Sequence, residues 1–244
     1  MTTPDVVTTA PPQDASVMDD IIEIFYAPSR VFERRRINPK FGAAFLILVV
    51  LFAIGTWVML RNLAPVMDAQ MSRQMAEAMR KNPQLTQDQL EQGRRIGQMI
   101  APISGIFIAV IATLILGVVI WVVGKFFDSK ADVKHGLMIA TLASFPRVID
   151  LILAAVLAMV VGTENVPNML AATPSLARFA PAGLSPQLLG LLSRVSIGVV
   201  WATILIAIGL HVVGRIPKGR AYAAAIIIWV LGSALAVASA ARSV

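Results

Sequence analysis

The chain contains no cysteine and only two histidines among its 244 residues. The lack of cysteine excludes disulfides, thiolate chemistry and cysteine-based metal sites. Charged residues are also scarce, at 14% of the sequence, against about 25% in soluble domains. No His-x-x-x-His pair, glycine-rich phosphate loop or set of nucleophile, base and orienting group is present. We therefore expect no metal, no cofactor and no enzymatic activity.

Long apolar runs are what the sequence has in excess, since hydrophobic residues make up 57% of it. A hydrocarbon core about 30 Å thick requires roughly 20 apolar residues per helix. We therefore predict an all-α, polytopic membrane protein whose transmembrane domain covers residues 41–241. Its five transmembrane helices are expected at about 41–60, 100–124, 137–161, 193–214 and 221–241.

Basic residues predict how these helices are threaded. The two short connections, between spans two and three and between spans four and five, are densely basic and hold Lys125, Lys130, Lys134, Arg215, Lys218 and Arg220. Cytoplasmic loops carry an excess of lysine and arginine. We therefore expect a cytoplasmic N-terminus and an external C-terminus. The net charge of +7 is attributed to the membrane surface, and we expect no nucleic acid partner.

Two segments precede the first span. Residues 1–16 are polar and rich in Thr and Pro, which predicts a disordered tail without a signal peptide. Residues 17–40 show apolar side chains at helical spacing, Phe25 and Phe32 among them, with a restart at Pro28. This pattern predicts an amphipathic, cytoplasmic helix in the membrane interface. Its cations, Arg30, Arg34, Arg35, Arg36 and Lys40, would each gain about 1 kcal/mol beside anionic lipid head groups. The alternative is a basic flank that only sets topology.

The external loops contain helix signals of their own. Methionines recur every fourth residue, at Met67, Met71, Met75 and Met79, which predicts a helix from about residue 64 to residue 80. Four thioethers could bind Cu(I), but methionine is also an adaptable packing residue, and no His or Cys completes a site. Thr86 and Gln89 form a capping box that predicts the next helix. Ser185 before Pro186 predicts the start of span four.

The third span contains Ser144, Pro146, Arg147 and Asp150. Arg147 and Asp150 are three residues apart on one helix face, about half-way through the span. An unpaired charge at that depth costs at least about 2.5 kcal/mol, so we predict an intramembrane ion pair. The pair either lines a polar pathway, with Ser144, Pro146 and His211 as further members, or fixes the register of the bundle. His211 would alternatively be a hydrogen-bonding residue near the cytoplasmic end of span four.

The segment Ile24-Phe25-Tyr26-Ala27-Pro28-Ser29-Arg30-Val31-Phe32-Glu33 resembles the entry of bacterial Yip1-domain proteins before their first span. The five spans, the cytoplasmic connection that runs into Gly136 and the proline of span three are similar as well. The resemblance implies an integral protein of the bacterial inner membrane with a cytoplasmic N-terminus. It covers about residues 20–240.

Eukaryotic relatives of that family act in vesicle traffic and bind small Rab GTPases. Their Asp-Leu-Tyr-Gly-Pro type motif is absent here. From the resemblance we therefore expect the topology of the family, and we do not expect binding of a small GTPase. Our hypothesis is a non-enzymatic membrane scaffold or adaptor in membrane organisation or trafficking. Its expected partners are anionic lipids and other membrane proteins or a second copy of the chain. The alternative is a small transporter or channel subunit with a polar path past Arg147 and Asp150.

Overall fold

The computed structural model describes residues 15–84, 86–161, 172–181 and 183–242, and this part of the chain is helical apart from loops and one bridge between Ser175 and Ser196. The elements in chain order are α1 (Val17–Glu23), α2 (Pro28–Ile37), α3 (Gly42–Asn62), α4 (Ala64–Lys81), α5 (Gln87–Phe126), α6 (Val133–Ala143), α7 (Phe145–Val161), the 3₁₀ helix η2 (Leu176–Phe179), α8 (Pro186–Leu192), α9 (Ile197–Val212) and α10 (Lys218–Arg242). Nearly all of the predicted tail 1–16 lies outside the described residues.

Four helical segments of the described chain are long and apolar enough to cross a membrane: Gly42–Asn62, Ile103–Phe126, Val133–Leu157 and Lys218–Ala238. They correspond to the predicted spans one, two, three and five. The predicted span 193–214 differs, because its helix α9 has only 16 residues. Ser185 does cap a helix as predicted, but this helix, α8, ends at Leu192, and α9 starts separately after Ser196.

The third apolar segment is interrupted at Ser144, between α6 and α7. The Ser144 amide donates to the Thr141 carbonyl, and the Arg147 amide donates to the Ser144 carbonyl, so the chain is tightened to i,i+3 bonds here. Pro146 has no amide proton to continue the α-helical pattern. The Ser144 hydroxyl donates to the Ala140 carbonyl at 2.7 Å, which leaves this buried side chain satisfied.

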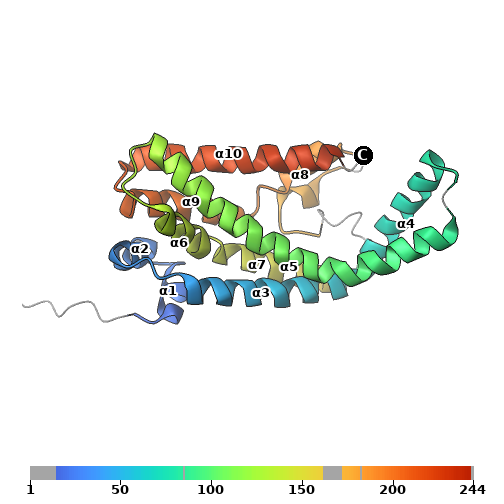
Figure 1. Cartoon of the computed structure of the whole chain (residues 1–244), viewed down its shortest axis with the longest axis horizontal. Helices are drawn as coiled ribbons and strands as arrows, with labels where there is room; N and C mark the ends of the chain where they lie inside the picture. The colour runs from blue at the N-terminus through green and yellow to red at the C-terminus, as the bar shows by residue number, and fades with distance from the viewer. Residues whose placement is uncertain (1–14, 85, 162–171, 182, 243–244) are drawn as a thin grey trace, which may run out of the picture.

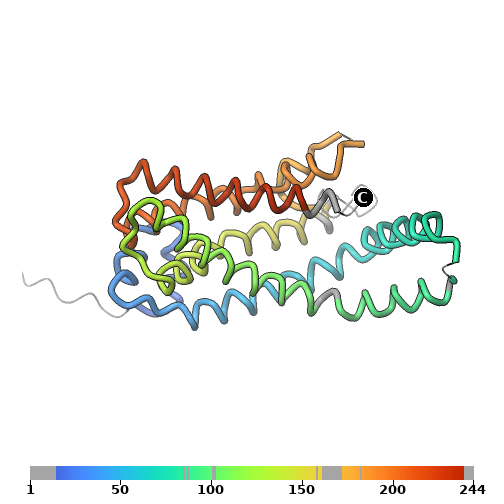
Figure 2. Tube along the Cα trace, turned by 45° about the horizontal axis from the view of Figure 1, so that its top comes forward, coloured from blue at the N-terminus to red at the C-terminus, as the bar shows by residue number. Residues whose placement is uncertain are grey.

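The bundle places α3 and α10 on opposite sides, with α6, α7 and α9 between them, as Figure 1 shows. Helix α5 crosses diagonally: it lies beside α10 at the end that holds α2 and diverges from it toward the other end (Figures 1 and 2). Close packing of α5 on α6 depends on two glycines. A Cβ atom at Gly136 would collide with the Gly117 carbonyl oxygen, and a Cβ at Gly117 would lie 2.8 Å from the Leu137 Cα. Only glycine permits this approach.

Helix α4 and the first part of α5 project from the bundle as two helices joined by a short loop (Figures 1 and 2). We call residues 64–81 and 87–100 the hairpin. Helix α5 has 40 residues and is therefore about 60 Å long at 1.5 Å per residue. The capping box of Thr86 and Gln89 begins it as predicted. The predicted methionine helix is confirmed as α4, and Met71 approaches Gly97 of α5.

The segment 17–40 forms two short helices that pack onto the bundle. Ala27 precedes the new start at Pro28, where the sequence predicts a restart. Ile24, Val31 and Phe32 are fully buried and belong to the main core, with α2 against α9. The large apolar side chains that remain exposed in this segment are Met18, Ile22, Tyr26 and Ile37. The helical spacing predicts that side chains such as Phe32 face the membrane, but Phe32 is buried in the bundle. The exposed apolar side chains therefore lie on a different face of the segment.

Candidate functional site

Asp150 contacts the N-terminus of α9. One carboxylate oxygen accepts a hydrogen bond from the Ser196 hydroxyl at 2.6 Å, and the other accepts from the Gly198 amide at 3.0 Å. Gly198 is required for this contact, because a Cβ there would lie 2.5 Å from the carboxylate. A negative charge at a helix N-terminus satisfies free amides and interacts favourably with the helix dipole. Asp150 of α7 thus caps α9 from a different helix.

Arg147 does not form the predicted ion pair. Among the described residues, no carboxylate oxygen lies within 4.0 Å of its guanidinium nitrogens. Asp150 instead uses both of its carboxylate oxygens at the start of α9, one for the Ser196 hydroxyl and one for the Gly198 amide. Arg147 instead lines a cavity.

This cavity has a volume of about 470 Å³ and lies between α5, α7, α9 and α10. A second arginine, Arg194, lines it from the connection between α8 and α9. Two like charges, those of Arg147 and Arg194, therefore face the same cavity. The Trp229 indole donates to the Arg194 carbonyl at 3.2 Å, and Trp229 lies near the middle of α10. Arg194 therefore lies at the level of the middle of the bundle, whereas the predicted span 193–214 would place it at the external end of that span.

The other members of the predicted polar pathway lie apart from this cavity. His211 is at the opposite end of α9 from Asp150, about 20 Å away along the helix axis from Gly198. One of its ring nitrogens is 2.7 Å from the Ile216 carbonyl, so it fixes the turn that follows α9. Ser144 is bonded within α6, and Pro146 is buried at the start of α7. The structure thus separates these residues rather than joining them in one path.

The end of the bundle that holds α2 contains a buried charge cluster. Asp20 is 3% exposed and pairs with Arg34 at 2.7 Å and with Arg35 at 2.5 Å. Arg34 also pairs with Glu23 at 2.9 Å. Removing one member of such a buried cluster leaves the others uncompensated, at a cost of about 3–5 kcal/mol. Arg34 and Arg35 therefore hold α1 to α2.

The same end presents a surface with many exposed cations. These are Arg30, Lys40, Lys125, Lys130, Lys134, Arg215, Lys218 and Arg220, and we call this surface the basic end. Hydrogen bonds join its parts: the Lys130 amide donates to the Gly214 carbonyl at 2.9 Å, and a His135 ring nitrogen is 2.9 Å from the Arg36 carbonyl. Arg36 itself is half-buried. The loops and α2 thus form one connected surface.

His135 also takes part in the start of α6. Its backbone amide bonds the Asp132 carboxylate at 3.0 Å, and its ring nitrogen Nδ1 is 2.7 Å from the same carboxylate oxygen. The backbone bond from His135 is the main reason that the pKa of Asp132 is lowered from its ordinary value. Asp132 is therefore a charged N-cap of α6, and the His135 ring connects this helix start to the Arg36 carbonyl.

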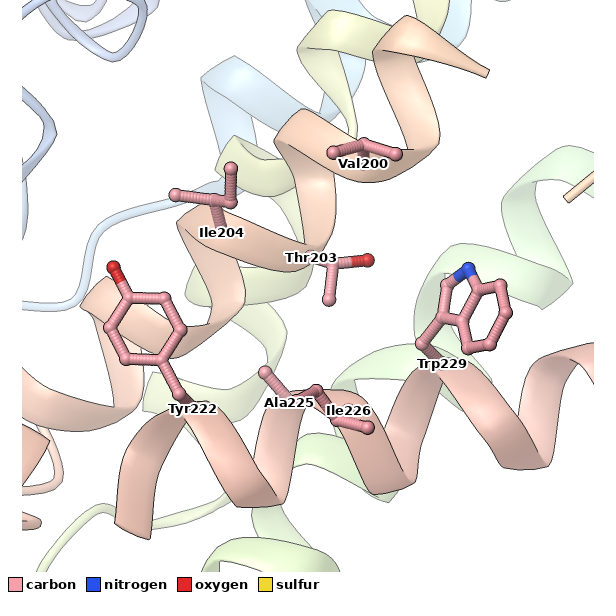
Figure 3. Close-up of a pocket in the computed structure, with 7 residues that line it drawn as sticks. All are labelled: Val200, Thr203, Ile204, Tyr222, Ala225, Ile226 and Trp229. Atoms are coloured by element: carbon pink, nitrogen blue, oxygen red, sulfur yellow. The ribbon is translucent and has the colours of Figure 1, made fainter. Parts of the chain in front are cut away.

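A shallow groove runs along the outside of α9 and α10. Figure 3 shows Thr203 of α9 facing α10, between Tyr222 and Trp229. The groove holds about 240 Å³ and is lined by no charged residue. Thr203 donates to the Val199 carbonyl at 2.9 Å, so its hydroxyl is engaged within the helix. Thr203 and Trp229 also line the 470 Å³ cavity, so the groove and the cavity share these two side chains.

Sequence reasoning missed three of these residues. The signal for Ser196 was present, because a serine before an apolar run is an N-cap pattern. Arg194 gave no signal, since it follows a proline-rich loop and its depth depends on α8. Asp20 gave no signal, because its partner Arg34 is fourteen residues away, across a break between two helices.

The architecture defines a helical integral membrane protein. The Yip1 domain family matches residues 22–239, which is most of the chain. The chain therefore belongs to the Yip1-domain family, as the segment from Ile24 to Glu33 suggests. No curated protein and no solved structure matches the chain significantly.

Proposed function

We propose that this chain is a non-enzymatic membrane scaffold or adaptor that receives its partners at the basic end. The observation that carries the proposal is the docking of α1 and α2 into the bundle core. Ile24, Val31 and Phe32 are buried there, whereas Ile22, Tyr26 and other apolar side chains remain exposed beside the cations. A fixed surface that combines apolar and basic groups suits both anionic lipid and a second membrane protein.

We also propose that the basic end is cytoplasmic and that α8 and α9 together complete a fifth crossing. Support comes from Lys125, Lys130, Arg215 and Lys218, which lie within a few residues of span ends. This arrangement corresponds to the bacterial inner-membrane type of the family. A reporter fused after Val244 should be active only outside the cytoplasm. Cytoplasmic activity of that fusion would reject the topology.

The transporter alternative has weaker support in the geometry. Both oxygens of Asp150 are bonded to α9, and His211 is bonded to the turn after α9. Asp150 and His211 are thus engaged in structural hydrogen bonds and do not form, together with Arg147, a continuous path for a transported molecule. A scaffold requires no such path.

Site-specific photocrosslinking in native membranes tests the scaffold proposal. A photoreactive amino acid at Tyr26 or Ile37, 69% and 88% exposed, samples the basic end. The same group at Met99, which is 69% exposed on the hairpin, is a matched control. We expect a discrete protein adduct, either a second copy or another membrane protein, from the basic end and not from Met99. Adducts to lipid alone at both Tyr26 and Ile37 would contradict the scaffold proposal.

The same protein tests the lipid contact. Charge reversal at two exposed cations, Arg30→Glu and Lys40→Glu, should weaken crosslinking from Tyr26 to anionic lipid, because each cation contributes about 1 kcal/mol near the head groups. High salt should have the same effect. Crosslinking to lipid that changes with neither charge nor salt would leave these residues as topology signals only.

A further inference from the structure

We propose that the cavity between α5, α7, α9 and α10 binds an acyl-chain lipid whose anionic head group, phosphate or carboxylate, is held between Arg147 and Arg194. This site lies between the helices and opens toward the outer surface of α5 and α10, where Ile115 and Leu235 are 57% and 74% exposed. It does not depend on the proposed scaffold role of the basic end.

The charges around the cavity require an anion. Arg147 and Arg194 both line it, and among the described residues neither guanidinium has a hydrogen bond or an ion pair. Asp150, which lies one helical turn after Arg147 on α7, is bonded through both oxygens to the start of α9. Two like charges that repel each other in a low-dielectric interior are costly unless a counter-charge is present. A bound anion supplies that counter-charge to both.

The position of Arg194 is fixed from two sides. Its carbonyl accepts from the Trp229 indole, and its Nη2 lies against Gly232, where a Cβ atom would be only 3.1 Å away. Its Nε is buried and has no partner among the described residues. An arginine held in this position is preorganised to bind an oxyanion, because the planar N–H donors of the guanidinium match the geometry of a phosphate or a carboxylate.

The remainder of the cavity is suited to a hydrocarbon chain. Apart from the two arginines and Thr203, its lining is apolar and includes Ala112, Leu116, Ile206 and Leu235. The volume of about 470 Å³ falls within the 300–1,000 Å³ of small-molecule sites. A bare phosphate ion would occupy only the part beside the arginines. An amphiphile uses both parts, with its charge at the arginines and its chain along α5 and α10.

Native mass spectrometry of the delipidated full-length chain tests this site. The probes are oleic acid, phosphatidic acid, neutral diacylglycerol and inorganic phosphate. We expect both anionic amphiphiles to bind at least about tenfold more tightly than diacylglycerol. A difference between oleic and phosphatidic acid identifies the preferred head group, and either preference supports the site. Equal binding of diacylglycerol would overturn it.

Three variants locate the binding. Arg194→Gln should weaken both anionic amphiphiles at least about tenfold, whereas Arg61→Gln, which removes an exposed cation resting on Trp57 at 5.5 Å, should leave binding unchanged. Ala112→Phe keeps both arginines and fills the apolar part, so it should block oleic acid and leave inorganic phosphate binding as in the wild type. Melting temperatures show whether each variant is folded.

Each outcome supports or overturns the site. If Arg194→Gln is folded and binds as the wild type does, or if Ala112→Phe still binds oleic acid fully, the cavity is not the site. If inorganic phosphate competes fully and binds as tightly as phosphatidic acid, the site is for free anions and the lipid proposal fails. Should Arg194→Gln not fold, Ala112→Phe alone decides.

Discussion

The bundle and the hairpin are both helical but differ in what surrounds their side chains. Helix α6 buries seven of its eleven residues, from Gly136 to Ala143, whereas α4 buries only Val66 of its eighteen. Stability in the bundle therefore comes from close contact between helices, while the hairpin depends on local helix formation and its caps. Matched substitutions in the two regions should separate these contributions.

The largest difference is expected between two deletions of apolar side chains. Phe32→Ala removes a fully buried ring from the core between α2 and α9 and should cost about 3–5 kcal/mol of unfolding free energy. Met99→Ala, 69% exposed on the hairpin, should change stability by less than about 0.5 kcal/mol. Thermal unfolding in detergent, followed by size-exclusion chromatography, measures both. Equal effects would mean that α2 is not part of the core.

The second comparison concerns two aspartates that accept hydrogen bonds. Asp150→Ala deprives the Ser196 hydroxyl and the Gly198 amide of their acceptor and should cost about 2–4 kcal/mol. The matched change Asp68→Ala removes an exposed bond from Gln98, 3.2 Å long, and should cost less than about 0.5 kcal/mol. The same thermal unfolding measurement compares them.

A double variant distinguishes capping from the ion pair that the sequence predicts. An Arg147–Asp150 pair requires Arg147→Ala to restore stability to Asp150→Ala, because both charges are then removed. The capping contact requires no such restoration, since the start of α9 stays without its acceptor. The single variant Arg147→Ala is the control, because it removes the like charge beside Arg194 in both cases. A double variant that gains more stability over Asp150→Ala than Arg147→Ala gains over the wild type would favour the pair.

Hydropathy was sufficient to predict most of the fold. Uncharged runs predict α3, the apolar part of α5 and α10, because a helix with about 20 consecutive apolar residues is suited to the hydrocarbon core of a bilayer. The start of α9 has an N-cap signal in Ser196. The depth of Arg194 was not predictable, because only the packing of α8 against α10 shows it. The acceptor role of Asp150 was equally hidden, because Ser196 is 46 residues away in sequence. Contacts between helices, rather than the spacing within one, determined the candidate site.

Two glycines provide the third comparison. Gly136→Ala places a Cβ against the Gly117 carbonyl and 2.9 Å from the Trp121 Cβ, so α5 and α6 must separate, at about 1–3 kcal/mol. Gly93→Ala in the hairpin meets nothing within 4 Å and should stabilise by up to about 1 kcal/mol, because alanine is the better helix former. The two variants should therefore shift the melting temperature in opposite directions. A loss of stability in Gly93→Ala would show that the hairpin packs more closely than its exposure indicates.

The smallest effect separates two helix caps. Asp132→Ala and Thr86→Ala each remove an N-cap contact worth about 1 kcal/mol, but α6 starts in the bundle and α5 starts in the hairpin. We expect only Asp132→Ala to lower global stability, whereas Thr86→Ala should increase amide hydrogen exchange in the first turn of α5 alone.

The lowered pKa of Asp132 makes the contribution of this cap to stability depend on pH. Because the folded-state pKa lies below the ordinary value of about 3.9, the cap contributes fully above about pH 4 and loses its contribution as the pH falls through the folded-state pKa. The stability difference between wild type and Asp132→Ala should thus be constant near neutral pH and vanish in strong acid; a difference that grows on acidification would contradict a charged cap.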